Sequence, residues 1–345
     1  MQPKNRKTYQ EGGIEMNKYS NKKALNGNGK YSTVIESMLK TIWVYSYESE
    51  IKKLAELYEK AKKEQWNASS DIDWSIEVDL EKLALTSFFF PITFQEVWEE
   101  LDDRKKVELA TSNTSWVMSQ ILHGEQGALL VASQLVSSAP LYDEKLTAAT
   151  QVIDEARHVE VFHRYLTTKM NKEFPITPHL EALMKNILSE SRWYFKFVGM
   201  QVLVEGLAMG IFGTLEKFGE EPLGTQIVRY VMKDEARHVA FGVISLKEHI
   251  DQLPTTEKKE LVEFAYEGCV HLRNRIVDQS MVWEDVGLPT QRMQEIVERS
   301  PVFQDFLMLM FARVVPNLKK LGLLPDYIRP HYENLGILKY EDLEL

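Results

Sequence analysis

The sequence predicts an all-α protein. Glycine (17) and proline (12) are sparse among the 345 residues, and the segments between their clusters are too long for β-strands. Apolar residues recur at helical spacing, as at Val117, Ile121, Leu129 and Val136, whereas the alternation typical of strands is nearly absent. We therefore expect long helices that pack against one another.

Four long segments form the expected core, and shorter helices flank it. The core helices are expected at about 94–137, 143–169, 178–217 and 222–250. Breaks at Pro140, 175–178 and 219–224 separate them, because proline and glycine end helices. The flanking helices are expected at roughly 31–64, 75–88, 256–280 and 300–321. Thr255 and Thr256 before an acidic first turn are a typical helix start.

Length, charge and cysteine content narrow the class of protein. Nothing resembles a linker, so we expect a disordered tail over 1–30 and one helical domain over 31–345, with its core at about 94–250. The net charge of −10 argues against a nucleic-acid-binding protein, which normally presents a basic face. A single cysteine, Cys269, excludes an intramolecular disulfide and any multi-cysteine metal site, but the eight histidines leave histidine–carboxylate sites open.

The sequence indicates neither a signal peptide nor a membrane-spanning helix. Residues 1–30 are polar and lack the apolar stretch of a signal peptide, so we expect a cytoplasmic protein. Residues 197–215 are apolar and about long enough to cross a bilayer, but Glu205 lies in their middle, where a charge is costly in lipid. We expect this segment to be a helix buried on all sides of a bundle.

One internal repeat stands out. The hexapeptide Asp-Glu-Ala-Arg-His-Val occupies residues 154–159 and recurs unchanged at 234–239. In each copy the glutamate and the histidine are three residues apart (Glu155 with His158, Glu235 with His238), so both side chains lie on one helix face and can reach a common centre. The repeat indicates a two-helix unit used twice.

Two further glutamates accompany the repeat at equal spacing. Glu125 precedes Glu155 by 30 residues, and Glu205 precedes Glu235 by 30 residues. Each lies in a strongly apolar helix. Burying an ionised carboxylate there without a partner would cost on the order of several kcal/mol. Thirty residues span one helix, a turn and the return to the same level of an antiparallel partner, so all four carboxylates are expected at one level of the core.

The resulting set of side chains is typical of a dinuclear metal site in a helical bundle. Two helices each contribute one glutamate, and two others each contribute a Glu-x-x-His pair. The expected ligands are Glu125, Glu155, His158, Glu205, Glu235 and His238. Oxygen-rich ligands with two imidazoles suit iron or manganese, and four carboxylates neutralise two divalent ions. We expect two metal ions, as an Fe/Fe or a Mn/Fe pair.

The aspartates of the repeat are expected to support the histidines. Asp154 and Asp234 each lie four residues before a histidine, and in an antiparallel bundle each could accept the ring N–H of the opposite copy's histidine. We expect Arg157 and Arg237 to point away from the metal face and to pair with neighbouring helices.

Nearby histidines and tryptophans are expected to be structural. His163 follows His158 by five residues and His123 precedes Glu125 by two, so helical geometry turns both away from the site. The three tryptophans ahead of the core are expected to pack, with electron transfer open for one of them: Trp43, Trp66 and Trp74.

With these motifs the chain resembles the ferritin-like superfamily of di-iron carboxylate oxygenases and oxidases. The doubled Asp-Glu-x-Arg-His is similar to the hydroxylase subunits of bacterial multicomponent monooxygenases, and residues 57–75 resemble the segment ahead of the core in ribonucleotide reductase small subunits. The resemblance spans about residues 40–250. It implies a four-helix bundle with additional helices, in which Glu155 and Glu235 partly bridge two metal ions.

Several positions depart from individual subgroups. The radical tyrosine of ribonucleotide reductase small subunits is replaced by Phe162, and the Val–Tyr crosslink of ligand-binding oxidases by Gly127 and Met200. Arylamine N-oxygenases carry a further ligand histidine at the position of Val231, and multicomponent hydroxylases a threonine at that of Met209. The chain therefore matches the superfamily but no single subgroup in full.

The function expected from the motifs and the resemblance is dioxygen-dependent oxidation of a small organic substrate. Electrons would come from an external donor, since no flavin or nicotinamide motif is present, and we expect a homodimer. Space for the substrate is expected beside small residues, namely Gly127, Ala128, Gly206 and Gly210. The alternatives are a radical-generating subunit similar to that of ribonucleotide reductase, and an iron-binding bundle without catalysis.

Overall fold

The computed structural model of the chain describes residues 24–25, 31–86, 94–219, 221–339 and 341–343. Two compact units make up the chain, Met1–Glu36 and Ser37–Leu345. Most of the expected tail lies outside the described residues, but β1 (Ala24–Leu25) pairs antiparallel with β2 (Tyr31–Ser32) in the first unit. The regular elements described in the second unit are all helices, so the all-α prediction is confirmed. The single-domain boundary at residue 31 stays a prediction.

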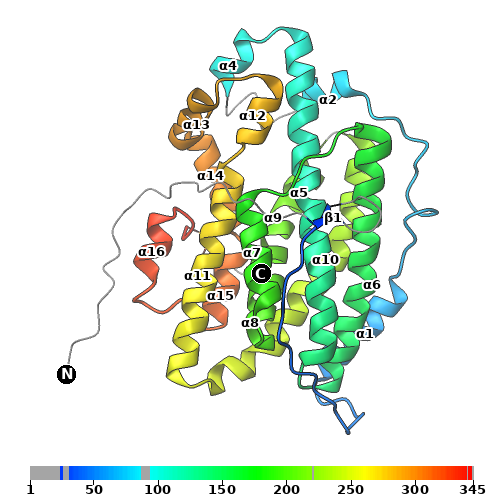
Figure 1. The fold of residues 1–345 in the computed structure, drawn as a ribbon, viewed down its shortest axis with the longest axis vertical. Helices are drawn as coiled ribbons and strands as arrows, with labels where there is room; N and C mark the ends of the chain where they lie inside the picture. The colour runs from blue at the N-terminus through cyan, green and yellow to red at the C-terminus, as the bar shows by residue number, and fades with distance from the viewer. Residues whose placement is uncertain (1–23, 26–30, 87–93, 220, 340, 344–345) are drawn as a thin grey trace. The chain divides into compact units, whose positions relative to one another are not determined.

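The core of the second unit consists of four long helical segments that pack side by side (Figure 1). They are α5 (Asp103–Ser138), α6 (Tyr142–Tyr165), the continuous run α8 (Trp193–Phe197), η2 (Val198–Val204) and α9 (Glu205–Phe218), and α10 (Pro222–Gln252). α5 packs along α6, and α10 packs against both α9 and α6. Glu125, Glu155, Glu205 and Glu235 thus come from four different segments of one bundle.

Carboxylate side chains cap the first turns of two core helices. The carboxylate of Asp102 accepts a hydrogen bond from the backbone N–H of Lys105 at 2.8 Å and so caps α5. Glu221 accepts in the same way from Leu223 at the start of α10, whose first residue is Pro222. These caps begin the two helices at fixed residues and thereby set the level at which their metal-site glutamates lie.

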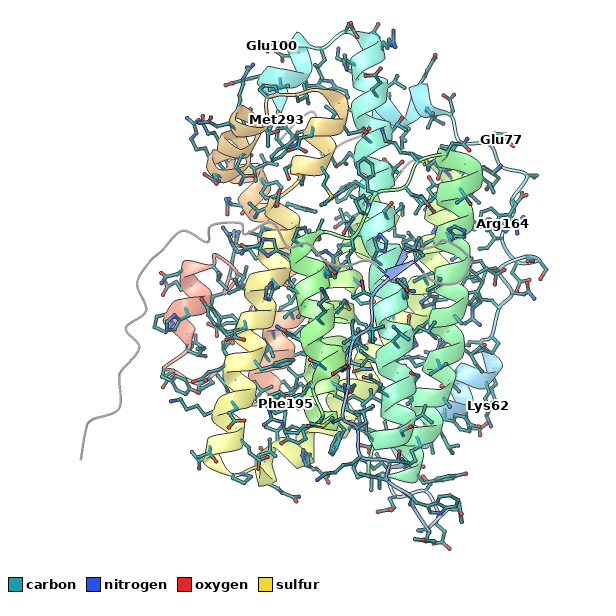
Figure 2. All side chains as sticks on the ribbon, in the orientation of Figure 1. Lys62, Glu77, Glu100, Arg164, Phe195 and Met293 are labelled. Atoms are coloured by element: carbon teal, nitrogen blue, oxygen red, sulfur yellow. The ribbon has the colours of Figure 1, made fainter. Side chains whose placement is uncertain are left out.

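Shorter helices surround the core: α1 (Lys52–Lys63), α2 (Leu80–Thr86), α4 (Gln95–Glu100), η1 (Leu166–Met170), α7 (Pro178–Ser189), α11 (Thr255–Val277), α12 (Ser280–Val286), α13 (Thr290–Arg299), α14 (Pro301–Met310), α15 (Val314–Lys320) and α16 (Arg329–Asn334). Arg292 of α13 pairs with Glu100 of α4 at 2.9 Å, at the end of the bundle where Figure 2 labels Glu100 and Met293. α11 packs against α7 and η2 and so covers the core beside Glu205.

The expected helix over 31–64 is wrong for its first half. Only Lys52–Lys63 is helical, and residues 33–51 form no regular element. Their backbone groups bond elsewhere: Ile42 donates to the carbonyl of Ser137, and Glu50 and Ile51 donate to the carboxylate of Asp143. These contacts replace the hydrogen bonds that a helix would have made.

Two of the expected long helices are interrupted. The segment 94–137 breaks at Leu101 and Asp102: α4 ends before them, and Asp102 caps the start of α5. The segment 178–217 breaks after Ser189, where Glu190 accepts a hydrogen bond from the backbone N–H of Arg192 at 2.9 Å. Neither break contains glycine or proline, so the sequence offered no strong signal. The flanking helices also differ from the expected bounds: α2 begins at Leu80, α11 ends at Val277, and 300–321 divides into α14 and α15. The expected end of α2 at residue 88 lies outside the described residues.

The apolar segment before Glu205 is a core element. Among the residues that the structure describes, Trp193–Phe218 is the one helix long and apolar enough to cross a membrane, and 61% of its apolar window is buried inside the protein. Its central part, η2, is π-helical. Such wider turns are rare in proteins, and those that occur often lie at functional sites. The π-helical turn ends directly at Glu205, which is 3% exposed.

Candidate metal centre

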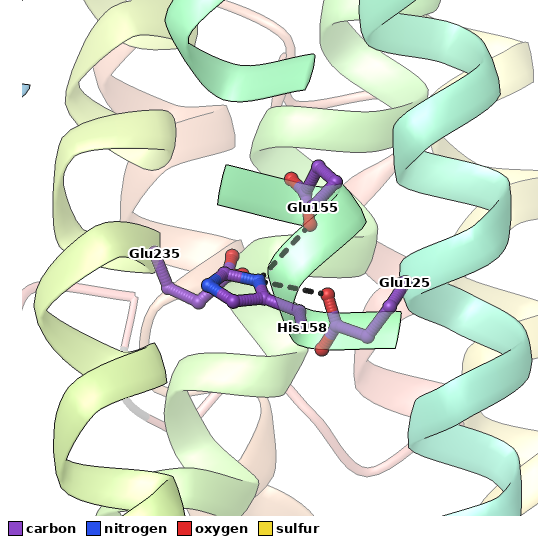
Figure 3. A group of neighbouring side chains, drawn as sticks. All are labelled: Glu125, Glu155, His158 and Glu235. Carbon is purple, nitrogen blue, oxygen red and sulfur yellow. Dashed lines mark hydrogen bonds and ion pairs between the residues drawn. The ribbon is translucent and has the colours of Figure 1, made fainter. Parts of the chain in front are cut away.

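The structure brings all six expected ligands together in the bundle core. They form two overlapping groups whose candidate ligand atoms lie within 4.8 Å of one another: Glu125, Glu155, His158 and Glu235, and Glu155, Glu205 and His238. All six residues are buried. Figure 3 shows the first group, with His158 between Glu125, Glu155 and Glu235.

Two glutamates lie between the half-sites. Glu155 belongs to both groups, with Oε2 3.2 Å from Nδ1 of His158 and Oε1 3.2 Å from Nδ1 of His238. Glu235 has Oε1 3.3 Å from Nδ1 of His158 and Oε2 3.6 Å from Nδ1 of His238. This placement is the one that bridging carboxylates would need, and the resemblance had implied it for the same two residues.

The histidines present one nitrogen to the carboxylates and the other to an aspartate across the bundle. Nε2 of His158 lies 3.1 Å from Asp234, and Nε2 of His238 lies 3.2 Å from Asp154. An ionised aspartate can only accept, so each Nε2 carries a proton and each Nδ1 faces the cluster. The expected crossed hydrogen bonds between the two copies of the repeat are therefore present.

The arginines of the repeat pair with neighbouring helices, as expected, and they do so in the core. Arg157 and Arg237 are buried, at 7% and 4% exposed. Arg157 contacts Asp154 at 2.6 Å and Asp234 at 3.0 Å, and Arg237 contacts the same two aspartates. The residues that directly follow α1 cover this network, since Gln65 accepts from Arg157 and Glu64 pairs with Arg237. Periodicity in the core helices does not encode this burial.

The buried charges shift the pKa values of the cluster in opposite directions. Burial and the neighbouring Glu235 raise the pKa of both Glu125 and Glu205. Burial alone would also raise the pKa of Glu155, but His238 and His158 outweigh it and lower that pKa. Burial opposes the charged form of His158, yet its hydrogen bonds to Asp234 and Glu125 raise its pKa. Four carboxylates in a dry core need compensating positive charge, which protons or metal ions can supply.

Several cluster atoms lack hydrogen-bond partners within the part of the chain that the structure describes. They are both carboxylate oxygens of Glu235, Oε2 of Glu205 and Nδ1 of His238. The ion-pair distances above connect some of them, but not with hydrogen-bonding geometry. Buried polar atoms are normally satisfied, and these are lone-pair atoms of residue types that ligate iron and manganese. The residues present therefore fit a pair of divalent ions.

Three contributors were missed or undervalued at the sequence level. Gln151 donates to Glu155 at 3.0 Å and to Glu205 at 2.6 Å, and Gln201 donates to Gln151 at 3.1 Å. A signal existed for Gln151, because it lies one helical turn before Glu155. Trp66 was expected to pack in the core, but its indole N–H also donates to Asp234 at 2.7 Å.

The remaining histidines and tryptophans stay outside the cluster. His123 lies 3.0 Å from the carbonyl of Phe174, and His163 is exposed beside Glu173. Trp74 is half-buried and donates to the carbonyl of Ala68. Trp43 is 72% exposed, so the expectation that it packs in the core is wrong.

A small cavity at the cluster adjoins a larger one further out. An inner cavity of about 20 Å³ is lined by Glu125, Glu205 and Glu235, and an outer cavity of about 170 Å³ is lined mainly by apolar side chains. Both are lined by Gln120, Ile211 and Arg275, which therefore separate them. The inner cavity is the size of one or two small molecules such as water, and the outer one can hold an aromatic ring.

The glycines expected to leave substrate space are packed instead. A Cβ at Gly127 would lie 2.3 Å from the sulfur of Met184, one at Gly206 would lie 3.3 Å from Val314, and one at Gly210 would lie 2.8 Å from the carbonyl oxygen of Met310. These glycines permit close helix approach, so that expectation is wrong for them. Ala128 does line the inner cavity.

A protein-family model described as P-aminobenzoate N-oxygenase AurF matches residues 48–322. The chain belongs to this family. The expected superfamily and the expected activity are thereby confirmed: the protein is a dioxygen-activating oxygenase or oxidase of the dinuclear-metal type. Val231, at the position where arylamine N-oxygenases carry a further histidine, is a fully buried apolar residue here.

The fold is that of R2-like ligand-binding oxidases. A mutant of such an oxidase with an aerobically reconstituted Mn/Fe cofactor has a TM-score of 0.50 at 16% identity, covering 79% of this chain and 93% of that chain. Another mutant, with an anaerobically reconstituted Mn/Fe cofactor, has a TM-score of 0.51 at 17% identity and the same coverage. No curated protein sequence gives a significant match. The structural likeness confirms the ferritin-like bundle.

Proposed function

We propose that this family member binds two divalent metal ions, Fe/Fe or Mn/Fe, through the six clustered residues. Glu125 and His158 would serve one ion, Glu205 and His238 the other, with Glu155 and Glu235 between them. The observation that carries the proposal is that Glu155 belongs to both ligand groups, while the oxygens of Glu235 lie between the two histidines without a hydrogen-bond partner among the described residues. Mn/Fe cofactors in the solved oxidases support the choice of metals.

When bound, the metal pair supplies the electrons and the oxygen-binding chemistry that organic side chains lack. The protein's own residues orient and isolate it. Asp154 and Asp234 hold the two imidazoles in the tautomer that leaves Nδ1 free, and Gln151 holds the carboxylates of Glu155 and Glu205. The apolar helices around the inner cavity exclude bulk water from the reacting groups.

We further propose that the substrate is a small single-ring molecule, with an amine as the group oxidised. The outer cavity has the volume for one ring, and the matching family is described by an N-oxygenase. An external protein would deliver electrons, and a cytoplasmic homodimer would be the working form. The radical-generating alternative is not favoured, because Phe162, at the radical-tyrosine position, is a buried ring stacked on Phe212 without a hydroxyl group.

The test is metal stoichiometry together with O2 consumption. Protein reconstituted anaerobically with Fe(II) should bind about two ions per chain and consume O2 faster when a single-ring amine and a reductant are present. Glu205→Ala should bind fewer ions. A stoichiometry of one that Glu205→Ala leaves unchanged would contradict the paired site. Oxidation of the amine without any second protein would contradict the radical-generating alternative.

A further inference from the structure

The outer surface of helices α5 and α6 is uncharged over most of its length. Glu125 is the only Asp, Glu, Lys or Arg over residues 109–142, and it is buried in the metal cluster. Over residues 146–159 every charged side chain is buried as well. Other surface helices of this chain expose charges, as α1 does with the ion pair of Lys52 and Glu56. In a protein with 27% charged residues, an uncharged surface on two long helices requires an explanation.

This surface lies opposite the metal centre on each helix. Leu130 lies about 140° around the axis of α5 from Glu125, and Ile153 lies about 160° around the axis of α6 from Glu155. The exposed positions recur at helical spacing and form one stripe on each helix: Gln126, Leu130 and Ser133 on α5, and Ala149, Ile153 and Ala156 on α6. Because α5 packs along α6 (Figure 1), the two stripes form one continuous surface, which we call the outer face.

An irregular segment adds large apolar side chains at one end of the outer face. Residues 37–47, which we call the strap, are held there by two contacts. The backbone N–H of Ile42 donates to the carbonyl of Ser137 at 2.9 Å, and the ring of Tyr47 meets that of Tyr142 edge-on, with centroids 5.1 Å apart. The largest side chains of the strap are nevertheless exposed: Met38 (87%), Trp43 (72%), Tyr45 (85%) and Tyr47 (64%). Tryptophan and tyrosine are enriched in protein interfaces, so the strap presents interface side chains on an anchored backbone.

The outer face and the strap together have the area of a stable interface. Two adjacent stripes about 20 Å long on helices about 10 Å wide cover roughly 400 Å². A fully exposed aromatic side chain offers about 150–250 Å², so the three rings of the strap add roughly 330–550 Å² at their exposed fractions. The total of roughly 700–950 Å² matches the roughly 800 Å² that each partner buries in a specific complex. It exceeds the largest apolar patch of a typical monomer, which covers about 300–600 Å².

The missing charge indicates which partner fits this surface. Near a two-fold axis each residue lies close to its own copy, so a charged side chain there meets the same charge and is repelled. Two copies of a chain with a net charge of −10 repel one another, and an uncharged face is the surface on which they can approach. A different protein could meet charge with opposite charge, so it would not require a neutral face.

We propose that the outer face and the strap are the surface on which two copies of this chain form a two-fold symmetric dimer. This inference rests on the proposed function, which includes a homodimer, and it names the surface that joins the copies. The α5–α6 pair of one copy packs on the α5–α6 pair of the other, and Trp43 reaches across from the strap.

Sedimentation velocity of the full chain over a concentration series tests the proposal. The parent protein should have twice the 40.0 kDa of one chain. Leu130→Glu and Ile153→Glu place like charges across the two-fold axis, so each should weaken the dimer about 100-fold or more. Trp43→Ala should weaken it about 30-fold, as expected for an aromatic residue that dominates an interface. Leu309→Glu is the matched control and should leave the dimer intact, because Leu309 on α14 is 43% exposed and Leu130 is 46% exposed.

A cross-link gives a second measurement that holds even if a glutamate variant does not fold. Cys269 is the only cysteine and is fully buried, so Ile153→Cys creates one accessible thiol per copy. A short bis-maleimide should join two such copies and leave Leu309→Cys unlinked.

Three results would overturn the proposal: a monomeric parent protein, a dimer that Leu130→Glu and Leu309→Glu weaken alike, or an Ile153→Cys protein that stays unlinked. Mn(II) stoichiometry in the same samples separates the two hypotheses. Two ions per chain in a monomeric parent protein contradict the dimer alone, whereas fewer than two ions in an intact dimer contradict the proposed metal centre.

Discussion

Nε2 of His158 lies 3.1 Å from the carboxylate of Asp234, a residue 76 positions further along the chain and in the other copy of the repeat. The reciprocal pair, His238 and Asp154, is 3.2 Å apart. The two copies therefore complete each other, since each supplies the aspartate that orients the other's histidine. Both aspartates also pair with Arg157 and Arg237, so a change to one of them affects both half-sites.

Asp234→Asn tests this arrangement. The amide keeps the shape of the side chain but draws the imidazole proton less strongly, and losses of this kind cost about 10- to 100-fold in metal affinity or activity. We expect two bound metal ions and a slower reaction with O2, measured by stopped-flow spectroscopy. Asp143→Asn is the control, because Asp143 is a buried aspartate of α6 that accepts from backbone N–H groups. An O2 reaction slowed equally in both variants would contradict the assignment.

His158→Ala and His238→Ala should each bind less metal and lose the reaction with O2. The fold should survive, because apolar burial holds a bundle of this size together. Metal analysis gives the stoichiometry, and circular dichroism gives the helix content. His163→Ala, at an exposed histidine of the same helix as His158, should behave as the parent protein. A histidine variant that retains two tightly bound ions would show that this histidine is not a ligand.

Two glycines of α9 should respond to alanine with opposite signs. A Cβ at Gly210 would lie 2.8 Å from the carbonyl oxygen of Met310, a backbone atom that cannot easily move, so Gly210→Ala should destabilise the fold by about 1–3 kcal/mol. A Cβ at Gly213 meets nothing within 4 Å, so Gly213→Ala should stabilise the helix by roughly 0.5–1 kcal/mol. Denaturant unfolding measures both. Changes of the same sign would argue against the close contact of α9 with α14.

Glu144 should make stability depend on pH. Burial raises its pKa to about 7 in the folded protein, against the hydrogen bond from the backbone N–H of Leu141. Between its ordinary pKa of 4.5 and about 7 the folded state holds a proton that the unfolded state has released, so this contribution to stability falls as the pH rises through that window. The full loss is on the order of 3 kcal/mol above pH 7.

Glu144→Gln removes the titration and can still accept from Leu141. We expect this variant to match the parent protein near pH 5 and to have the higher melting temperature at pH 8. Thermal unfolding across this range measures the difference. If the melting temperatures of the two proteins changed with pH in the same way, Glu144 would ionise in the folded state without a loss of stability, and the prediction would be wrong.

The local pattern of the chain was enough for the helical class, the four core segments and the six clustered residues. Helical periodicity specifies which residues share a face, and the repeated Glu-x-x-His with a glutamate 30 residues earlier specifies which faces must meet. The crossed pairing of Asp154 and Asp234 with the histidines followed from the same repeat, because an antiparallel arrangement brings equal positions of the two copies to one level.

Only the tertiary structure decided what lies around those faces. Arg157 and Arg237 are buried because the residues that directly follow α1 cover them. Gln151 reaches Glu205 from another helix, and Arg275 lines the inner cavity from α11, 150 residues after Glu125. Packing also filled the space beside Gly127 and Gly210, where the substrate was expected. The outer cavity is lined by Trp116 instead. The physical reason is that periodicity sets the direction of a side chain about its own helix axis. The depth and angle at which helices approach, which decide what that side chain meets, depend on the volumes of all the side chains between them.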